Sequence, residues 1–452
     1  MMRIGKRGLF LILIAVFVSL FATHKIRRAY WRATLKKEIE PHQATPYSSF
    51  CSLKKYYQLK SNLVPLPKQI KTLFLPKKVE EGCHRISNIY AIEKIKKPFT
   101  LESFDHQDWR AQAIEKELEF FKRDKKLNVN VIDTFIKNIA HDPSWKDFYL
   151  LGHFQIKDGV LKVKDFTRQQ YRFREICFAL MRLLENVDLP DMEFLVSMHD
   201  SLEHADLNLS ASSVSSIDVP IFVCSKKTNT KSLLIFPDHE MLAGYEELEA
   251  LLEEDGTSVA WNEKVDKAFW RGATTSGDYS LDSWQTFPRT RLIDESIQDK
   301  GINIDAKFSF MTDVAKNNLA FYNFCEKHHV TTSLVSVPDH LMYKYLVDID
   351  GNASTYSRYY WILRSNCLPV KVAGDFMQWY YPGLSAWKHY LPVKSDLSDL
   401  KSQILWAENH DAEAKAMADN SAVFAKRYLS DDAVYSYLYH LLISYRALFE
   451  KD

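Results

Sequence analysis

Two aspartates, Asp348 and Asp350, stand at the end of an apolar stretch in YLVDIDGNASTYSRYYWILRSNCLPVKV, residues 345–372. If the stretch is a strand, both carboxylates lie on one face and could hold a divalent metal ion. Asp350 could instead brace the turn that follows it through its side chain. The spacing alone leaves both interpretations open.

The residues after this pair suit the binding of an anion. Gly351 and Asn352 favour a bend with positive φ. A helix is expected next, and its N–H groups and dipole attract phosphate. Arg358 lies in its first turns, where a positive charge opposes the dipole, so a bound anion is the favoured partner and a salt bridge the alternative. Three hydroxyl residues could cap this helix: Ser354, Thr355 and Ser357.

A second candidate loop follows the apolar run in KAFWRGATTSGDYS, residues 267–280. Arg271 and Gly272 end the run, and exposed amides after them could cradle a diphosphate while the arginine offsets its charge. The spacing is not that of a Walker loop, and an ordinary polar turn is the alternative. The small and hydroxyl residues of this loop are Thr274, Thr275, Ser276 and Gly277.

A carboxylate that could accept a proton ends the apolar segment MEFLVSMHD at Asp200. An aspartate at the mouth of a strand can act as general base toward a hydroxyl, although most such aspartates only cap turns. The neighbouring histidines form HDSLEH, residues 199–204, which does not match the H-E-x-x-H zinc pattern.

The elements that must position these residues alternate between helices and short apolar strands, which predicts an α/β fold with parallel sheets. Residues 108–124 and 169–187 have helical spacing, the first opened by an acidic N-cap candidate, and residues 147–163 suggest a hairpin that turns at Asp158-Gly159. From Leu400 onward, helix is expected. The apolar runs interpreted as strands are VPIFVCSK, SLLIFPDH, KAFWRGA, SLVSV, KYLVDI and CLPVKV.

Size and composition predict a globular protein of two domains. The chain has 452 residues, 46% of them hydrophobic, and a formal net charge of +1. Because the charges balance, no overall field attracts nucleic acid, and any anion specificity must be local. The six cysteines form no C-x-x-C pair, which argues against a zinc ribbon. Cys177, Cys224 and Cys367 are expected to be packed thiols, whereas Cys51 and Cys83 could pair in an oxidising compartment.

The N-terminus predicts a membrane anchor. Residues 8–23 are uncharged and follow a basic N-terminus at residues 1–7, and no clean signal-peptidase site follows them. We expect a single-pass segment, with basic flanks on both sides that leave its orientation open. A bacterial inner membrane and an ER or Golgi membrane are equally compatible.

Four segments, in order and in register, resemble glycosyltransferase family 90, which includes protein O-glucosyltransferases and lipopolysaccharide glycosyltransferases. They are PDMEFLVSMHD, KAFWRGATTSG, YKYLVDIDGNASTYSRYYWILRSNCLPVKV and YYPGLSAWKHYLPVKSDLSDL, within residues 108–450. The resemblance implies a GT-B fold, in which two Rossmann-like domains face a cleft. It also implies inverting transfer from a UDP-sugar, with no cofactor and no obligatory metal.

The resemblance assigns roles to matched residues. Asp200 matches the family's catalytic aspartate, which deprotonates the acceptor hydroxyl. Arg271 and Gly272 match an Arg-Gly that faces the diphosphate, and Ser357 and Arg358 match the segment where a helix meets the nucleotide. SLEH follows Asp200 where protein O-glucosyltransferases have Tyr-Pro, and the bend before Arg358 is about one residue longer, so the acceptor is left open by these two segments. DIDGN and YWILRSN more closely resemble the bacterial saccharide-modifying branch, which implies a glycan or lipid-linked acceptor, with protein serine as the alternative.

The resulting expectation is a membrane-anchored inverting glycosyltransferase. The alternatives are a metal-dependent GT-A transferase that uses Asp348 and Asp350, and a catalytically silent glycan-binding protein of the same fold. Besides Arg271, Gly272 and Arg358, the donor site is expected to include Thr275, Ser276, Gly351, Asn352, Ser354 and Ser357. The expected parts are a stem at 24–100, an acceptor-side domain at 101–245, a nucleotide-sugar domain at 246–400 and C-terminal helices at 401–452 that pack back across both.

Overall fold

The computed structural model describes residues 94–122, 126–139, 151–165, 170–203, 217–255 and 259–450. All of these belong to one compact unit, Val64–Asp452. The anchor expected at residues 8–23, nearly all of the stem, and Cys51 and Cys83 lie outside the described residues. Of the helices in the described ranges, none has the length and apolar character needed to cross a membrane.

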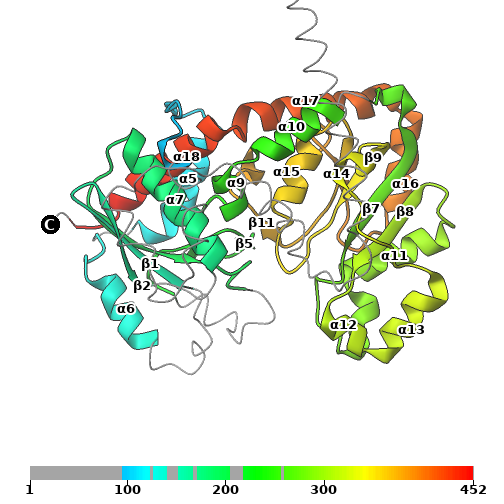
Figure 1. Ribbon diagram of the computed structural model, residues 1–452, viewed down its shortest axis with the longest axis horizontal. Helices are drawn as coiled ribbons and strands as arrows, with labels where there is room; N and C mark the ends of the chain where they lie inside the picture. Colours follow the sequence, from blue (N-terminus) through cyan, green and yellow to red (C-terminus); the bar gives the residue numbers. More distant parts are fainter. Residues whose placement is uncertain are drawn as a thin grey trace, which may run out of the picture. The chain divides into compact units, whose positions relative to one another are not determined.

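The first sheet, called sheet 1, has the strand order β2-β1-β3-β4-β6, and Figure 1 labels its strands β1 and β2. β1 is antiparallel to β2 and β3, while β3, β4 and β6 are parallel. The hairpin turn at Asp158 and Gly159 is confirmed, since both residues have positive φ, of 53° and 68°. The strands are β1 (Leu151–Lys157), β2 (Val160–Asp165), β3 (Met192–Ser197), β4 (Ile221–Val223) and β6 (Leu233–Ile235).

The second sheet, sheet 2, is parallel throughout and has the order β12-β10-β9-β7-β8. Counted along the chain within this sheet, the order is 5-4-3-1-2, so the winding direction reverses between β7 and β9. The strands are β7 (Val265–Ala273), β8 (Ile304–Phe310), β9 (Tyr343–Asp348), β10 (Leu368–Val372) and β12 (Leu391–Val393). The mixed α/β class predicted from the sequence, with parallel strands, is therefore confirmed.

One strand assignment was wrong, and the strands β8, β11 (Phe376–Met377) and β12 were missed. SLVSV is not a strand: its last residue begins α14 (Val337–His340), because Ser336 caps that helix and Pro338 suits its first turn. β8 escaped the sequence analysis because charged Asp305 and Lys307 alternate with its buried residues, so it is not a continuous apolar run.

Two predicted helices have the expected positions. α5 (Trp109–Leu118) begins after Asp108, whose carboxylate accepts a hydrogen bond from the Arg110 N–H, and α7 is Gln170–Asn186. The other α-helices are α6 (Val131–Ile139), α9 (His239–Ala243), α10 (Glu246–Asp255), α11 (Pro288–Gln298), α12 (Asp313–Asn317), α13 (Leu319–His328), α15 (Ser357–Arg364), α16 (Leu400–Asn409), α17 (Asp411–Tyr428) and α18 (Asp431–Arg446). Short 3₁₀ helices are η1 (Glu119–Phe121), η3 (Trp261–Glu263), η4 (Asp282–Thr286) and η5 (Tyr381–Gly383).

The C-terminal helices contact elements of both sheets. α17 packs on α15 and β10, and α18 packs on α5 and α9 (Figure 1). The hydroxyl of Tyr445 on α18 donates to the carbonyl of Glu193 in β3 at 2.8 Å, and Ser421 on α17 donates to the carbonyl of Leu363 at 3.0 Å. One large apolar cluster includes side chains from sheet 1, α15 and α18, and a second fills the space around sheet 2. Cys177, Cys224 and Cys367 are buried free thiols, as predicted.

Candidate active site

The two loops singled out in the sequence follow neighbouring strands of sheet 2. The β7 loop (residues 274–281) follows β7, and the β9 loop (residues 349–356) follows β9 and leads into α15. β7 and β9 are paired and parallel, so both loops leave the same edge of the sheet, at the position where the winding reverses. In open α/β sheets, ligands bind beyond the carboxyl ends of the strands at such a position.

Arg289, which the sequence analysis missed, ties these two loops together. It lies in the first turn of α11, is 7% exposed, and donates from Nη1 to Ala273 O at 3.0 Å and to Thr275 Oγ1 at 2.5 Å. Its Nε donates to Asp350 O at 3.1 Å. The signal that could have revealed it is a basic residue in the first turn of a helix, the argument already applied to Arg358.

The predicted bend at Gly351 and Asn352 is present, but Gly351 serves close packing and does not supply the positive φ that was expected. Neither Gly351 nor Asn352 has positive φ. A Cβ at Gly351 would lie 2.7 Å from Arg289 Nη2 and 2.8 Å from Thr275 Oγ1, so only glycine lets the β9 loop approach so closely. Positive φ occurs instead at Tyr356 in the β9 loop, 46°, and at Ser276 in the β7 loop, 85°. The Ser276 N–H lies 3.5 Å from the side-chain oxygen of Asn352.

The predicted hydroxyl cap of α15 is wrong. Tyr356 occupies the N-cap position with φ 46°, and no side chain caps the helix. Ser354 and Thr355 have other partners: Ser354 Oγ lies 2.9 Å from Ser225 Oγ, and Thr355 donates to the Asp348 carboxylate. The N–H groups of residues 358 and 359 bond to carbonyls of the β9 loop. Those two amides are therefore used within the chain, and the charge of Arg358 is the stronger attraction for an anion here.

Positive charge is concentrated around Arg358. Its Nη2 donates to Arg271 O at 2.6 Å, which within the described part of the chain is its only side-chain hydrogen bond. Burial lowers the pKa of Arg358, an effect that the Asp348 carboxylate opposes. Burial and the charge of Arg358 together lower the pKa of Arg289 to about 10. Because burial disfavours the charge of both arginines, an anion placed near them would stabilise both.

The guanidinium of Arg271 is engaged within sheet 2. Its Nη2 lies 2.8 Å from Asp305 Oδ1, and its Nη1 donates to the carbonyls of Asp305 and Trp270 at 2.9 Å each. An anion would have to compete with Asp305 for this side chain, so the role predicted for Arg271 depends on that competition. A Cβ at Gly272 would lie 2.4 Å from the Trp270 ring, so this glycine makes room for the indole.

A buried lysine forms ion pairs with both aspartates of the possible metal site. Lys371 Nζ, on β10, lies 2.5 Å from Asp348 Oδ2 and 3.3 Å from Asp350 Oδ1. Burial alone would lower the pKa of Lys371, but the two carboxylates outweigh it and hold the pKa above its ordinary value. A divalent ion bound here would have to displace this ammonium group, so the pair does not suit a metal. The sequence feature that could have revealed this ion pair is the charged Lys371 inside the apolar run CLPVKV.

Asp200 lies three residues beyond β3, which ends at Ser197, and not at the strand's last position as predicted. Its side chain is 25% exposed, and Oδ1 accepts a hydrogen bond from Arg172 Nη2, on α7, at 2.6 Å. Arg172 also donates to Met198 O at 2.8 Å, so it holds the segment as well as the carboxylate. Burial lowers the pKa of Arg172, but the charge of Asp200, the hydrogen bond to it and the neighbouring Tyr356 and Cys224 together raise the pKa above its ordinary value.

The β9 loop contacts the loops that follow the strands of sheet 1. The hydroxyl of Tyr356 donates to Asp200 O at 2.5 Å, and the Ser354–Ser225 contact joins the β9 loop to the residues after β4. The short strands β5 (Lys226–Lys227) and β11 (Phe376–Met377) pair across the same region. Asp200 is therefore joined through Tyr356 to the segment that carries Arg358.

A comparison with protein families matches the part of the chain that contains these loops. The family model described as Glycosyl transferase family 90 matches residues 146–452, which include both sheets and all of these loops. The chain belongs to this family.

Named relatives are protein O-glucosyltransferases. Protein O-glucosyltransferase 2 of Danio rerio is 28% identical over 306 residues, which are 66% of this chain and 56% of the relative. Protein O-glucosyltransferase 3 of Homo sapiens is 28% identical over 272 residues, 59% of this chain and 49% of the relative. Protein O-glucosyltransferase 1 of Bos taurus is 22% identical over 308 residues, which are 65% of this chain and 71% of the relative. The chain thus spans about half the length of the first two.

Proposed function

We propose that the chain is an inverting glycosyltransferase that moves a sugar from a UDP-sugar to a hydroxyl on a glycan, a lipid-linked saccharide or a protein serine. The observation that carries the proposal is the contact between the β9 loop, with Arg358 beyond it, and the Asp200 segment. Family membership and the names of the relatives support the same class of reaction. In this proposal sheets 1 and 2 belong to the two Rossmann-like domains of a GT-B fold, with the acceptor side at 101–245 and the donor side at 246–400.

The donor diphosphate would lie beyond the carboxyl ends of β7 and β9. Arg358 would stabilise the charge that grows on the departing UDP, and Arg289 would hold the two loops in place around it. Residues proposed to line this donor site are Arg271, Gly272, Thr275, Ser276, Gly351, Asn352, Ser354, Ser357 and Arg358.

Asp200 would act as the base. The acceptor oxygen attacks C1 of the sugar from the face opposite UDP, its proton passes to an Asp200 oxygen, and the bond from C1 to the diphosphate oxygen breaks. The ion pair with Arg172 supports this role because it fixes the direction of the carboxylate. One displacement of this kind inverts the configuration at C1.

The proposed reaction needs no metal ion, because arginines supply the positive charge and the Lys371 ammonium already occupies the place between Asp348 and Asp350. This arrangement argues against the GT-A alternative that uses those two aspartates as ligands. A silent glycan-binding protein remains distinguishable by experiment, since it would bind sugar without releasing UDP.

A donor screen tests the proposal. The purified protein is incubated with individual UDP-sugars and candidate acceptors, and UDP release is measured together with the anomeric configuration of the product by NMR. We expect acceptor-dependent release with one sugar and an inverted product. Retention of configuration would overturn the single-displacement mechanism, and binding without turnover would favour the silent protein.

The membrane anchor at residues 8–23 stays a prediction from the sequence, and with it the localisation. Deleting residues 1–23 should shift the protein from the membrane pellet to the supernatant after cell fractionation. Recovery of the truncated protein in the pellet would contradict a single N-terminal anchor.

A further inference from the structure

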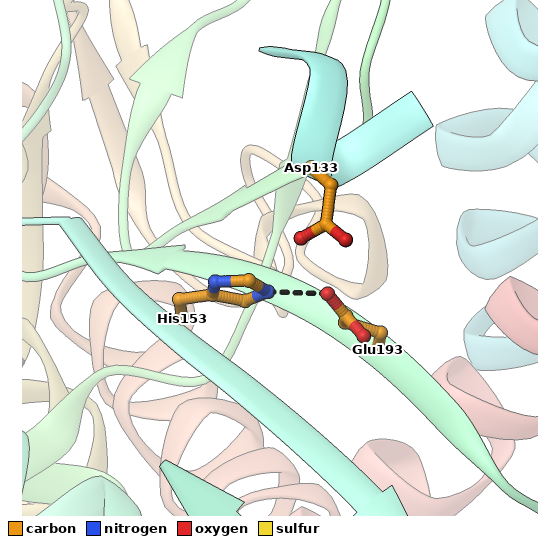
Figure 2. Close-up of side chains that lie close together, drawn as sticks. All are labelled: Asp133, His153 and Glu193. Carbon is orange, nitrogen blue, oxygen red and sulfur yellow. Dashed lines mark hydrogen bonds and ion pairs between the residues drawn. The ribbon is translucent and has the colours of Figure 1, made fainter. Parts of the chain in front are cut away.

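Three potential metal ligands from three elements converge on the face of sheet 1 beneath α6. His153 lies on β1, Glu193 on β3 and Asp133 on α6. In the antiparallel pairing of β1 with β3, Glu193 is opposite Gln155, so His153 and Glu193 are diagonal neighbours on one face. Figure 2 shows the Asp133 carboxylate directed toward the pair from the helix above.

The distances within this group, called the α6 cluster (Asp133, His153 and Glu193), are short. His153 Nε2 lies 2.5 Å from Glu193 Oε1, and the ligand atoms of all three residues lie within 4.8 Å of one another. Ligands that share one zinc ion at about 2.0–2.2 Å lie roughly 3 to 3.5 Å apart. Small rotations of the side chains would therefore place one ion among the three.

Neighbouring groups orient the ligands. Gln155 Nε2 donates to Glu193 Oε2 at 3.2 Å and so directs the carboxylate, while the Tyr445 hydroxyl holds the main chain of Glu193 through its carbonyl at 2.8 Å. The His153 residue is 5% exposed, so its ring is held under the helix. Hydrogen bonds of this kind around a ligand set direct the ligands and raise metal affinity.

We propose that the α6 cluster binds a divalent transition-metal ion, with Zn²⁺ the best match, and that the ion holds α6 against β1 and β3. One imidazole nitrogen with two carboxylates suits zinc, iron or manganese better than calcium or magnesium, which prefer oxygen ligands alone. Glu193 stands near the start of β3 and Asp200 follows its other end, so the site is separate from the proposed reaction centre. Its role is structural, and it does not depend on the proposed function.

The competing explanation is a hydrogen-bonded His–Glu pair beside an unrelated aspartate. The variant His153→Gln distinguishes a metal site from this hydrogen-bonded pair, because a glutamine amide can still donate to Glu193 but is a poor zinc ligand. Asp133→Asn is the second variant, since it alters only the helix side of the cluster. His106→Gln is the matched control: His106 is exposed and lies between Asp105 and Asp108, outside the cluster.

The full chain, stripped of metal and kept in detergent, is dialysed against buffered Zn²⁺, and bound zinc is counted by mass spectrometry. We expect wild type and His106→Gln to bind one zinc ion more per chain than His153→Gln and Asp133→Asn. Zinc should raise the melting temperature of wild type by several degrees and that of the two cluster variants by less. Cobalt should give d–d absorption bands that the cluster variants lack.

Equal zinc stoichiometry in all four proteins would overturn the proposal. So would equal melting-temperature shifts, because surface or N-terminal histidines and cysteines would then account for the binding. If His153→Gln does not fold, Asp133→Asn still decides between the two explanations, since loss of one bound zinc supports the cluster and its retention excludes it.

Discussion

On the sheet 1 side of the contact between the sheets, the polar group best placed for chemistry is a carboxylate; on the sheet 2 side, it is a set of arginines. Asp200 is held by one arginine and is one quarter exposed. The carboxylates of Asp348 and Asp350 on the other side are occupied by Lys371, and Arg358 and Arg289 stand near them. The difference suggests a division of labour in which one side accepts a proton and the other binds the anionic leaving group.

The largest effect is expected when the sheet 1 side loses its base. Asp200→Asn should lower the turnover rate by about 10²–10⁴-fold, since an amide cannot accept the proton of the acceptor. UDP affinity, measured by calorimetry, should change little because the proposed role of Asp200 involves the acceptor. Asp191→Asn, at a surface position before β3, is the control. Turnover within twofold of wild type would remove Asp200 from this role.

Removing Lys371, the buried ammonium on the sheet 2 side, should mainly affect the stability of the fold. Lys371→Met leaves Asp348 buried without its ammonium partner, which typically costs about 3–5 kcal/mol in the free energy of unfolding. Urea unfolding of the variant measures this loss. The double variant Lys371→Met with Asp348→Asn should recover part of it, because the unpaired charge is gone. If the double variant is no more stable than the single one, the ion pair is not the cause.

The sequence predicted the order of the major elements, because apolar runs and helical spacing reflect local backbone preference. It also found both loops at the reversal of sheet 2, since glycines, hydroxyls and arginines mark a strand's end. It missed Arg289 and Lys371, because Arg289 bonds to Asp350, 61 residues away, and Lys371 bonds to Asp348, 23 residues away. It misassigned the cap of α15 because Ser354 and Thr355 bond to Ser225 and Asp348, contacts that only the tertiary structure brings about.

The arginine at the start of α15 gives the next largest effect. Arg358→Ala should raise the activation free energy by about 2 to 4 kcal/mol, the range for removing a preorganised donor. UDP affinity should fall as well, unlike in Asp200→Asn. Arg358→Lys should retain part of the turnover and part of the UDP affinity, because lysine keeps the positive charge but lacks the paired N–H donors of the planar guanidinium. Arg291→Ala on α11 is the control, and a variant of Arg358 that loses activity with unchanged UDP binding would contradict the division of labour.

A smaller effect is expected from the hydrogen bond that joins the two sides. Tyr356→Phe removes the donor to Asp200 O, a bond worth about 0.5–1.5 kcal/mol, and the aromatic ring stays. We expect turnover to fall by up to about tenfold with UDP affinity nearly unchanged. Steady-state kinetics and calorimetry on the same preparation measure both quantities. A large loss of UDP affinity would mean that Tyr356 acts on the donor side instead.

The smallest effect is expected from a chelator, and it separates the arginine and metal explanations of the donor site. If Arg358 and its neighbours offset the diphosphate charge, EDTA should leave turnover unchanged, and Asp348→Asn should be less damaging to turnover than Arg358→Ala. If Asp348 and Asp350 held an ion, EDTA would abolish turnover, manganese would restore it, and Asp348→Asn would match the arginine variant. Because EDTA would also remove zinc from the α6 cluster, the assay is run well below the melting temperature of the metal-free protein. Unchanged turnover together with a lowered melting temperature would assign the metal to α6 and the diphosphate to the arginines, and strict dependence of turnover on an added divalent ion would reverse that assignment.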